Sequence, residues 1–192
     1  QFKNEIITEI AATLAFSALQ NNDKIGLILF SDEIELFIPP KKGKSHVLRI
    51  IRELIEHKPN SKETDIAMAL KYFSKVIKKK AIVFVLSDFI TDQYRETLKI
   101  VSRKHDVTGI RVYDKNEEQI PNLGMVQMED QETGELVLVN TSSKSVRNHY
   151  QATYLGRAAY FKESFQKSGA GALTCSVGES YVKKLLGYFK NR

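Results

Sequence analysis

The sequence contains very little cysteine. Its 192 residues include only Cys175, which excludes an internal disulfide and a cysteine-rich zinc site. A single cysteine is typical of a reducing compartment, so we expect a cytoplasmic location. The residues around Cys175 are largely apolar, which predicts a buried and unreactive thiol.

Long apolar runs are missing as well. No run approaches the ~20 residues that a membrane-spanning helix needs. No basic and then apolar segment of the signal-peptide type opens the chain. The chain starts at Gln1 and not at methionine, which is typical of a fragment. Hydrophobic residues make up 42% and charged residues 27%, a composition that indicates a globular domain.

The usual sequence signatures of catalysis are absent. There is no glycine-rich phosphate loop and no Gly-x-Ser-x-Gly nucleophile elbow. No nucleophile, base and orienting residue group together, so the sequence predicts a protein that is not an enzyme. The histidines are scattered singly, at His46, His57, His105 and His149.

Apolar strands alternate with helices in the first half of the chain. Unbroken apolar runs of strand length occupy residues 25–30 and 81–86, and residues 107–112 are predicted as a third strand. Such runs are typical of strands that are covered on both faces. The pattern therefore predicts an α/β fold with a parallel sheet between helices. The helices are expected over residues 2–20, 45–55, 66–77 and 93–104.

Shorter elements complete the prediction. Residues 34–38 are predicted as a short strand and 39–44 as a loop, after which Ser45 caps a helix. Beyond residue 113 the pattern predicts an antiparallel hairpin around residues 130–134, from strands at 125–128 and 136–139. A long helix over 144–167, a strand over 173–177 and a helix over 181–189 follow. No linker or repeat divides the chain, so a single domain is expected.

Candidate binding residues follow the predicted strands. Ligands of open parallel sheets bind beyond the carboxyl ends of the strands. The strand 81–86 closes with Ser87 and Asp88. The carboxylate of Asp88, with the hydroxyls of Ser87 and Thr64, suits Mg²⁺. Spacing alone leaves an alternative open, in which Asp88 caps a turn and Thr64 caps the next helix. The other candidates on this edge are Ser31, Asp32, Asp65, Tyr113 and Asp114.

The net charge of +6 is concentrated at the C-terminal end. Residues 1–143 hold 20 Lys+Arg and 21 Asp+Glu, whereas residues 144–192 hold 9 and 2. A basic segment beside a neutral core favours an acidic partner surface or a membrane over a nucleic acid. The basic runs 41–44 and 78–80 and the acidic residues of 117–118 and 129–132 are predicted to be solvated.

Five segments together resemble one bacterial family. They are residues 14–18 (LAFSA), 22–32 (NDKIGLILFSD), 38–43 (IPPKKG), 64–66 (TDI) and 85–89 (VLSDF). The family is domain of unknown function 58, whose members resemble von Willebrand factor A domains. Its genes commonly accompany MoxR-type AAA+ ATPases. The resemblance covers essentially the whole chain and is most specific in its first ninety residues.

The resemblance implies a Rossmann-like sheet with a metal-ion-dependent adhesion site. In such domains an Asp-x-Ser-x-Ser loop, a threonine and an aspartate hold Mg²⁺. Thr64 and Asp88 match the second and third positions, with Ser87 and Asp65 as possible neighbours. The first motif is absent, since the chain starts in the helix that would follow it. The resemblance therefore implies a partial metal site and a sheet that lacks its first strand.

The same resemblance implies one von Willebrand factor A-like domain over residues 1–192. Its core sheet and helices span 1–113, and a hairpin and helical elaboration span 114–192. The expected function is a protein-interaction module that works with a MoxR-type ATPase in the assembly or maturation of protein complexes. No nucleic acid is expected as a partner, and any membrane contact is peripheral.

Other functions are open from the sequence. A metal-dependent hydrolase would use Asp88 or Asp32, and a nucleic-acid-binding domain would use the basic residues. A scaffold could dock through aromatic side chains of the C-terminal helices, although their helical spacing predicts packing against the sheet. These side chains are Tyr150, Tyr154, Tyr160, Phe161 and Phe165.

Overall fold

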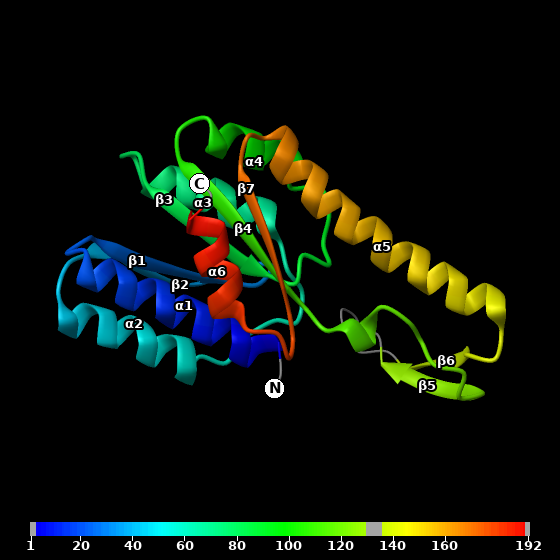
Figure 1. The fold of residues 1–192 in the computed structure, drawn as a ribbon. Coiled ribbons are helices and arrows are strands. Elements are labelled where there is room, and N and C mark those ends of the chain that lie inside the picture. The colour runs from blue at the N-terminus through cyan, green and yellow to red at the C-terminus, as the bar shows by residue number, and fades with distance from the viewer. Residues whose placement is uncertain (1–2, 130–135, 191–192) are drawn as a thin grey trace.

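A three-stranded parallel sheet lies at the centre of the fold (Figure 1). The computed structural model describes residues 3–129 and 136–190. The strand order is β3 (Ile82–Ser87), β4 (Asp106–Tyr113) and β7 (Gly171–Ser176). The middle strand β4 is buried from Val107 to Val112, as is typical of a strand that is covered on both faces. The expected α/β, Rossmann-like class is confirmed.

The strand at residues 25–30 lies outside this sheet. Strand β1 (Ile25–Phe30) pairs antiparallel with β2 (Ile34–Lys41), and no hydrogen bonds between described residues join it to β3. The third parallel strand is β7 instead. The strand β2 also extends through Pro39 and Pro40, where a loop was expected. A sheet edge tolerates proline, because a residue there needs no donor on its open side.

Helices cover both faces of the parallel sheet (Figure 1). Buried side chains of α1 (Lys3–Gln20) and α6 (Tyr181–Lys190) pack together with those of β4 and β7. Side chains of α3 (Ile66–Val76), α4 (Arg95–Ser102) and α5 (Lys144–Lys167) pack on the other face. Helix α2 (Lys44–Glu56) lies against α1. Its N-cap is Gly43, with φ of 105°, so the prediction that Ser45 caps it is wrong.

Aromatic rings fasten the carboxyl half of α5 to the sheet. The rings of Phe161 and Phe165 lie 4.5 and 5.5 Å from that of Phe89, and all three are buried. A Cβ at Gly109 in β4 would lie 2.4 Å from Cζ of Phe165, so only glycine allows this approach. The predicted packing of these aromatic residues against the sheet is confirmed for Phe161 and Phe165.

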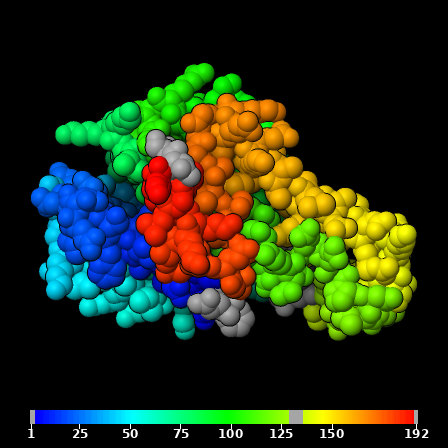
Figure 2. Space-filling model, viewed as in Figure 1, coloured from blue at the N-terminus to red at the C-terminus, as the bar shows by residue number. Residues whose placement is uncertain are grey.

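The amino half of α5 and a hairpin project from this body (Figures 1 and 2). The hairpin pairs β5 (Met125–Glu129) with β6 (Leu136–Asn140), as predicted, and its turn at 130–134 lies outside the described residues. Leu136 and Leu138 are 62% and 64% exposed. The short 3-10 helix η1 (Lys115–Glu117) precedes the hairpin.

Candidate functional site at the carboxyl rim of the sheet

Asp88 occupies a turn directly after β3. Its Oδ1 accepts a long hydrogen bond of 3.4 Å from the backbone N–H of Ile90, so the turn-capping role considered for this residue is present. Its backbone carbonyl accepts a hydrogen bond from Nε of Arg111 at 3.1 Å. The Asp88 side chain remains 32% exposed, which leaves Oδ2 available to other groups.

The residue after Asp88 has an unusual backbone. Phe89 has φ of 53°, a left-handed conformation that is rare for a bulky residue and costs about 1–3 kcal/mol. Its N–H donates to Oγ of Ser87 at 3.0 Å, and its ring is completely buried in the aromatic core. The core therefore holds the turn that carries Asp88 in one conformation.

A lysine from the start of α1 binds Asp88. Nζ of Lys3 lies 3.2 Å from Oδ2 of Asp88 and 2.9 Å from Oε1 of Glu117 in η1. Burial of the ammonium acts to lower the pKa of Lys3, but hydrogen bonds and attraction from Glu117 and Asp88 outweigh it and raise the pKa. The ammonium thus stays charged. No local pattern in the sequence indicates this contact. Glu117 was expected on a solvated acidic face, but its side chain is only 36% exposed and pairs with Lys3.

A second cation lies beneath the rim. Arg111, near the end of β4, is only 5% exposed. Its guanidinium lies 5.0 Å from the ring centre of Tyr113 and 5.2 Å from that of Tyr154 in α5. Cation–π contacts of this kind stabilise a desolvated guanidinium. Arg111 therefore connects the turn of Asp88 to the projecting helix.

The loop before α3 joins the rim through backbone and capping bonds. The N–H of Asp65 donates to the carbonyl of Ser31, at 2.9 Å, just beyond β1. Oδ1 of Asp65 accepts from the N–H of Met68 at 2.8 Å, so Asp65 caps α3. The idea that Thr64 caps this helix is wrong, because α3 begins one residue later than that reading requires. Thr64 is exposed beside this cap.

A buried carboxylate secures the same loop. Glu35 in β2 has a side chain that is 2% exposed and binds His57, and it accepts from the N–H of Asn60 at 3.1 Å. Burial acts to raise the pKa of Glu35, but hydrogen bonds from Ser31, His57 and Asn60 outweigh it and lower the pKa. In the sequence His57 stands as an isolated histidine, because nothing in the order of residues indicates its pairing with Glu35.

The predicted metal residues are only partly brought together. Ser87 and Asp88 adjoin, and Ile66 and Phe89, which follow Asp65 and Asp88, share one buried cluster. Within residues 3–129 and 136–190, no three or more His, Cys, Asp or Glu side chains are grouped to hold a metal ion. The carboxylates of Asp88 and Glu117 do converge on one cation and are ligands that Mg²⁺ prefers. That chemistry fits a cation, but the cation bound there is Lys3.

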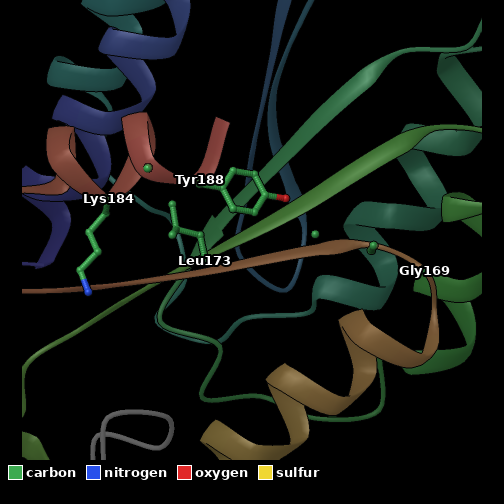
Figure 3. Close-up of a pocket in the computed structure, with 7 residues that line it drawn as sticks. Gly169, Leu173, Lys184 and Tyr188 are labelled. Atoms are coloured by element: carbon green, nitrogen blue, oxygen red, sulfur yellow. The ribbon is translucent and has the colours of Figure 1, made fainter. Parts of the chain in front are cut away.

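An open pocket of about 550 Å³ lies elsewhere, between α6 and the start of β7 (Figure 3). Its lining includes Leu173, Lys184 and Tyr188. Oη of Tyr188 lies 3.2 Å from Oγ1 of Thr108. The same Oη occupies the space that a Cβ at Gly171 would need. Because parallel strands share one direction, this pocket at the amino end of β7 is at the opposite end of the sheet from Asp88.

One family model matches most of the chain. A profile described as a protein of unknown function, DUF58, matches residues 1–159. An uncharacterized protein of Mycobacterium tuberculosis is 18% identical over 193 residues, which cover 99% of this chain and 61% of the relative. The chain thus spans about three fifths of that relative's length. An uncharacterized protein of Mycobacterium avium is 20% identical over 158 residues, 81% of this chain and 93% of the relative.

One solved structure is similar in fold. It is the crystal structure of an aerotolerance-related membrane protein from Bacteroides fragilis, with multiple mutations to serines. The TM-score is 0.53 at 16% identity, over 96% of this chain and 89% of that chain. In the part of the chain that our structure describes, no helix combines the length and apolar character needed to cross a membrane.

Proposed function

The chain belongs to the DUF58 family, and on that premise we propose that it is a non-enzymatic protein-interaction module that binds partners at the rim around Asp88. One observation carries the proposal. The Asp88 carboxylate is partly exposed, beside Lys3, on a strained turn that the buried ring of Phe89 holds in place. Strained and core-supported turns of this kind concentrate at binding sites.

The proposal includes a partial metal-ion-dependent adhesion site. Thr64 and Asp88 would be Mg²⁺ ligands, with Ser87 and Asp65 as neighbours, and the remaining ligands would come from an Asp-x-Ser-x-Ser loop on a strand before α1. Two features support a place for such a strand. Each of β1 and β3 has a strand partner on only one side among the described residues, and α1 contacts both. A free strand edge readily accepts a further strand.

A MoxR-type AAA+ ATPase, or one of its client proteins, is the partner in this proposal, and the process is the assembly or maturation of protein complexes. The resemblance to the family supports this choice. The bridging Mg²⁺ would join Asp88 to an acidic group of the partner. A cytoplasmic location completes the proposal and suits the free thiol of Cys175.

Binding to the ATPase tests the proposal. The MoxR-type ATPase from the same genome would be immobilised, and association of the chain followed by interferometry in millimolar Mg²⁺. We expect Asp88→Asn to weaken binding at least tenfold. The matched control is Asp92→Asn, which removes an exposed carboxylate four residues away. Equal binding by the chain and by Asp88→Asn would refute the rim as the binding surface.

Calorimetry tests the metal separately. A polypeptide lengthened at its N-terminus with the preceding strand and loop would be titrated with Mg²⁺. We expect a single site that Asp88→Ala abolishes and Asp92→Ala leaves unchanged. If the longer polypeptide binds no Mg²⁺, or if Asp88→Ala binds it equally well, the metal part of the proposal is wrong.

A further inference from the structure

We infer that Lys3 is the resident cation of the rim, and that its ammonium must leave Asp88 before a divalent cation can bind there. The inference deepens the proposed function and depends on it only for the location of the site. Neither the family description nor the relatives assign any role to Lys3 or Glu117.

The geometry is that of two carboxylates on one cation. Nζ of Lys3 lies 3.2 Å from Oδ2 of Asp88, and 2.9 and 3.0 Å from Oε1 and Oε2 of Glu117. The two carboxylates come from the end of β3 and from η1, so the fold and not the chain order brings them together. A lysine ammonium is a compact point charge with three donors, which suits it to the place of a small ion.

Each of the three side chains extends from a supported backbone. Helix α1, which begins at Lys3, is anchored by Ile6 and Ile10, which are 2% and 0% exposed. The turn of Asp88 is held by the buried ring next to it. Asp114 caps η1, and its carboxylate accepts a hydrogen bond of 2.9 Å from the N–H of Asn116. Because the ammonium belongs to the same chain, its effective concentration at the two carboxylates is high. A free metal ion must compete with this intramolecular cation.

This arrangement opposes a divalent ion in two ways. The ammonium occupies oxygens of Asp88 and Glu117 that the ion would need as ligands. Its positive charge also repels a second cation at short range, where the partly buried side chains limit screening. Lys3 is 21% exposed, so its side chain has a route to solvent once the contact is broken. Removal of the ammonium should therefore free both carboxylates for a metal.

Manganese binding to the 192-residue chain tests the inference. Free Mn²⁺ would be measured by electron paramagnetic resonance during titration of the chain, Lys3→Met and Lys3→Arg. We expect weak binding by the chain and at least tenfold tighter binding by Lys3→Met. Lys3→Arg keeps a cation in place and should bind as weakly as the chain. Adding Asp88→Asn to Lys3→Met should abolish the gain.

Two further variants keep the result interpretable. Lys24→Met removes one exposed lysine away from the rim, so it controls for the change in net charge. Lys3→Gln replaces Lys3→Met if the latter does not melt cooperatively. Unchanged Mn²⁺ affinity in the folded Lys3 variant, or an equal gain in Lys24→Met, overturns the inference. Failure of the proposed function is distinguishable, because it is read from ATPase binding by Asp88→Asn and not from Mn²⁺ affinity.

Discussion

Nζ of Lys3 lies 3.2 Å from Oδ2 of Asp88, across a separation of 85 positions in the sequence. The contact connects the start of α1 to the end of β3. Both side chains are partly exposed, at 21% and 32%. Solvent-accessible ion pairs contribute roughly 0–1 kcal/mol to stability, so the importance of this pair lies in its position at the rim.

Removing the carboxylate should therefore have a small effect on folding. We expect Asp88→Asn to lower the free energy of unfolding by less than about 1 kcal/mol, and salt to reduce the difference. Urea unfolding at low and at high ionic strength measures both quantities. A loss of several kcal/mol would show that Asp88 serves mainly to stabilise the fold.

Glu35 should make the protein sensitive to acid. Its pKa in the folded state is lowered, so the unfolded state takes up the proton first as the pH falls. The stabilisation is fully present above the ordinary glutamate pKa near 4.5 and is lost as the pH falls through the lowered folded value. Urea unfolding between neutral pH and about pH 3 should show this loss, and Glu35→Gln should flatten it.

A second glutamate provides the control for this acid effect. Glu56→Gln alters an exposed carboxylate at the end of α2. It should leave the pH dependence of the free energy of unfolding the same as in the unsubstituted protein. An equal flattening by Glu56→Gln, or none by Glu35→Gln, would contradict the assignment. The buried pairing with His57 would then not be the source of the acid sensitivity.

Two glycines should respond oppositely to the same change. Gly109→Ala places a Cβ 2.4 Å from Cζ of Phe165, and overpacking of this kind costs about 1–3 kcal/mol. Gly156→Ala lies in α5, where nothing is within 4 Å of the new Cβ, and should stabilise the helix by up to about 1 kcal/mol. Thermal unfolding of both variants measures the contrast. If Gly109→Ala leaves the unfolding temperature unchanged, the aromatic rings do not pack tightly against β4.

The stacked arginine should restrain the projecting helix. In Tyr154→Ala the guanidinium of Arg111 loses one of its two aromatic neighbours. We expect faster amide hydrogen exchange in residues 145–157, with unchanged exchange in β4. Leu155→Ala, at a neighbouring exposed position, is the control. If amide exchange in residues 145–157 is equally fast in the unsubstituted protein and in Tyr154→Ala, Arg111 does not restrain this helix.

Catalysis and nucleic-acid binding are the competing functions. We expect no phosphatase or nuclease turnover with Mg²⁺ or Mn²⁺ that depends on Asp88. We also expect no retardation of DNA or RNA at low salt, where basic proteins bind nucleic acids most strongly. Turnover that depends on Asp88 would show that the protein is an enzyme and contradict the interaction module. Nucleic-acid binding that weakens steeply with salt would favour the nucleic-acid-binding function.

Local patterns predicted the helices and most strands well. The long helix was expected over 144–167, and α5 spans those residues. Such elements are readable because their apolar spacing and their neighbours in sequence define them. Strand partners are not readable in this way. The run 25–30 pairs with β2 and not with the parallel sheet, and the prolines of β2 indicated a loop although a sheet edge accepts them.

The site was predictable only in part for the same reason. Asp88 was found because it directly follows an apolar strand, which is a local signal. Its contacts with Lys3 and Glu117, and the pairing of Glu35 with His57, join distant segments through side chains. Nothing in the order of residues indicates such pairs. The capping role went to Asp65 and not to Thr64, because helix starts are uncertain by one or two residues.

The central claim is that the rim around Asp88 is a protein-binding surface. Its most direct test is the affinity of the chain for the immobilised MoxR-type ATPase in Mg²⁺, compared with those of Asp88→Asn and Asp92→Asn. The account predicts at least tenfold weaker binding for Asp88→Asn and unchanged binding for Asp92→Asn. Equal affinities for all three, or no binding by the chain itself, would contradict it.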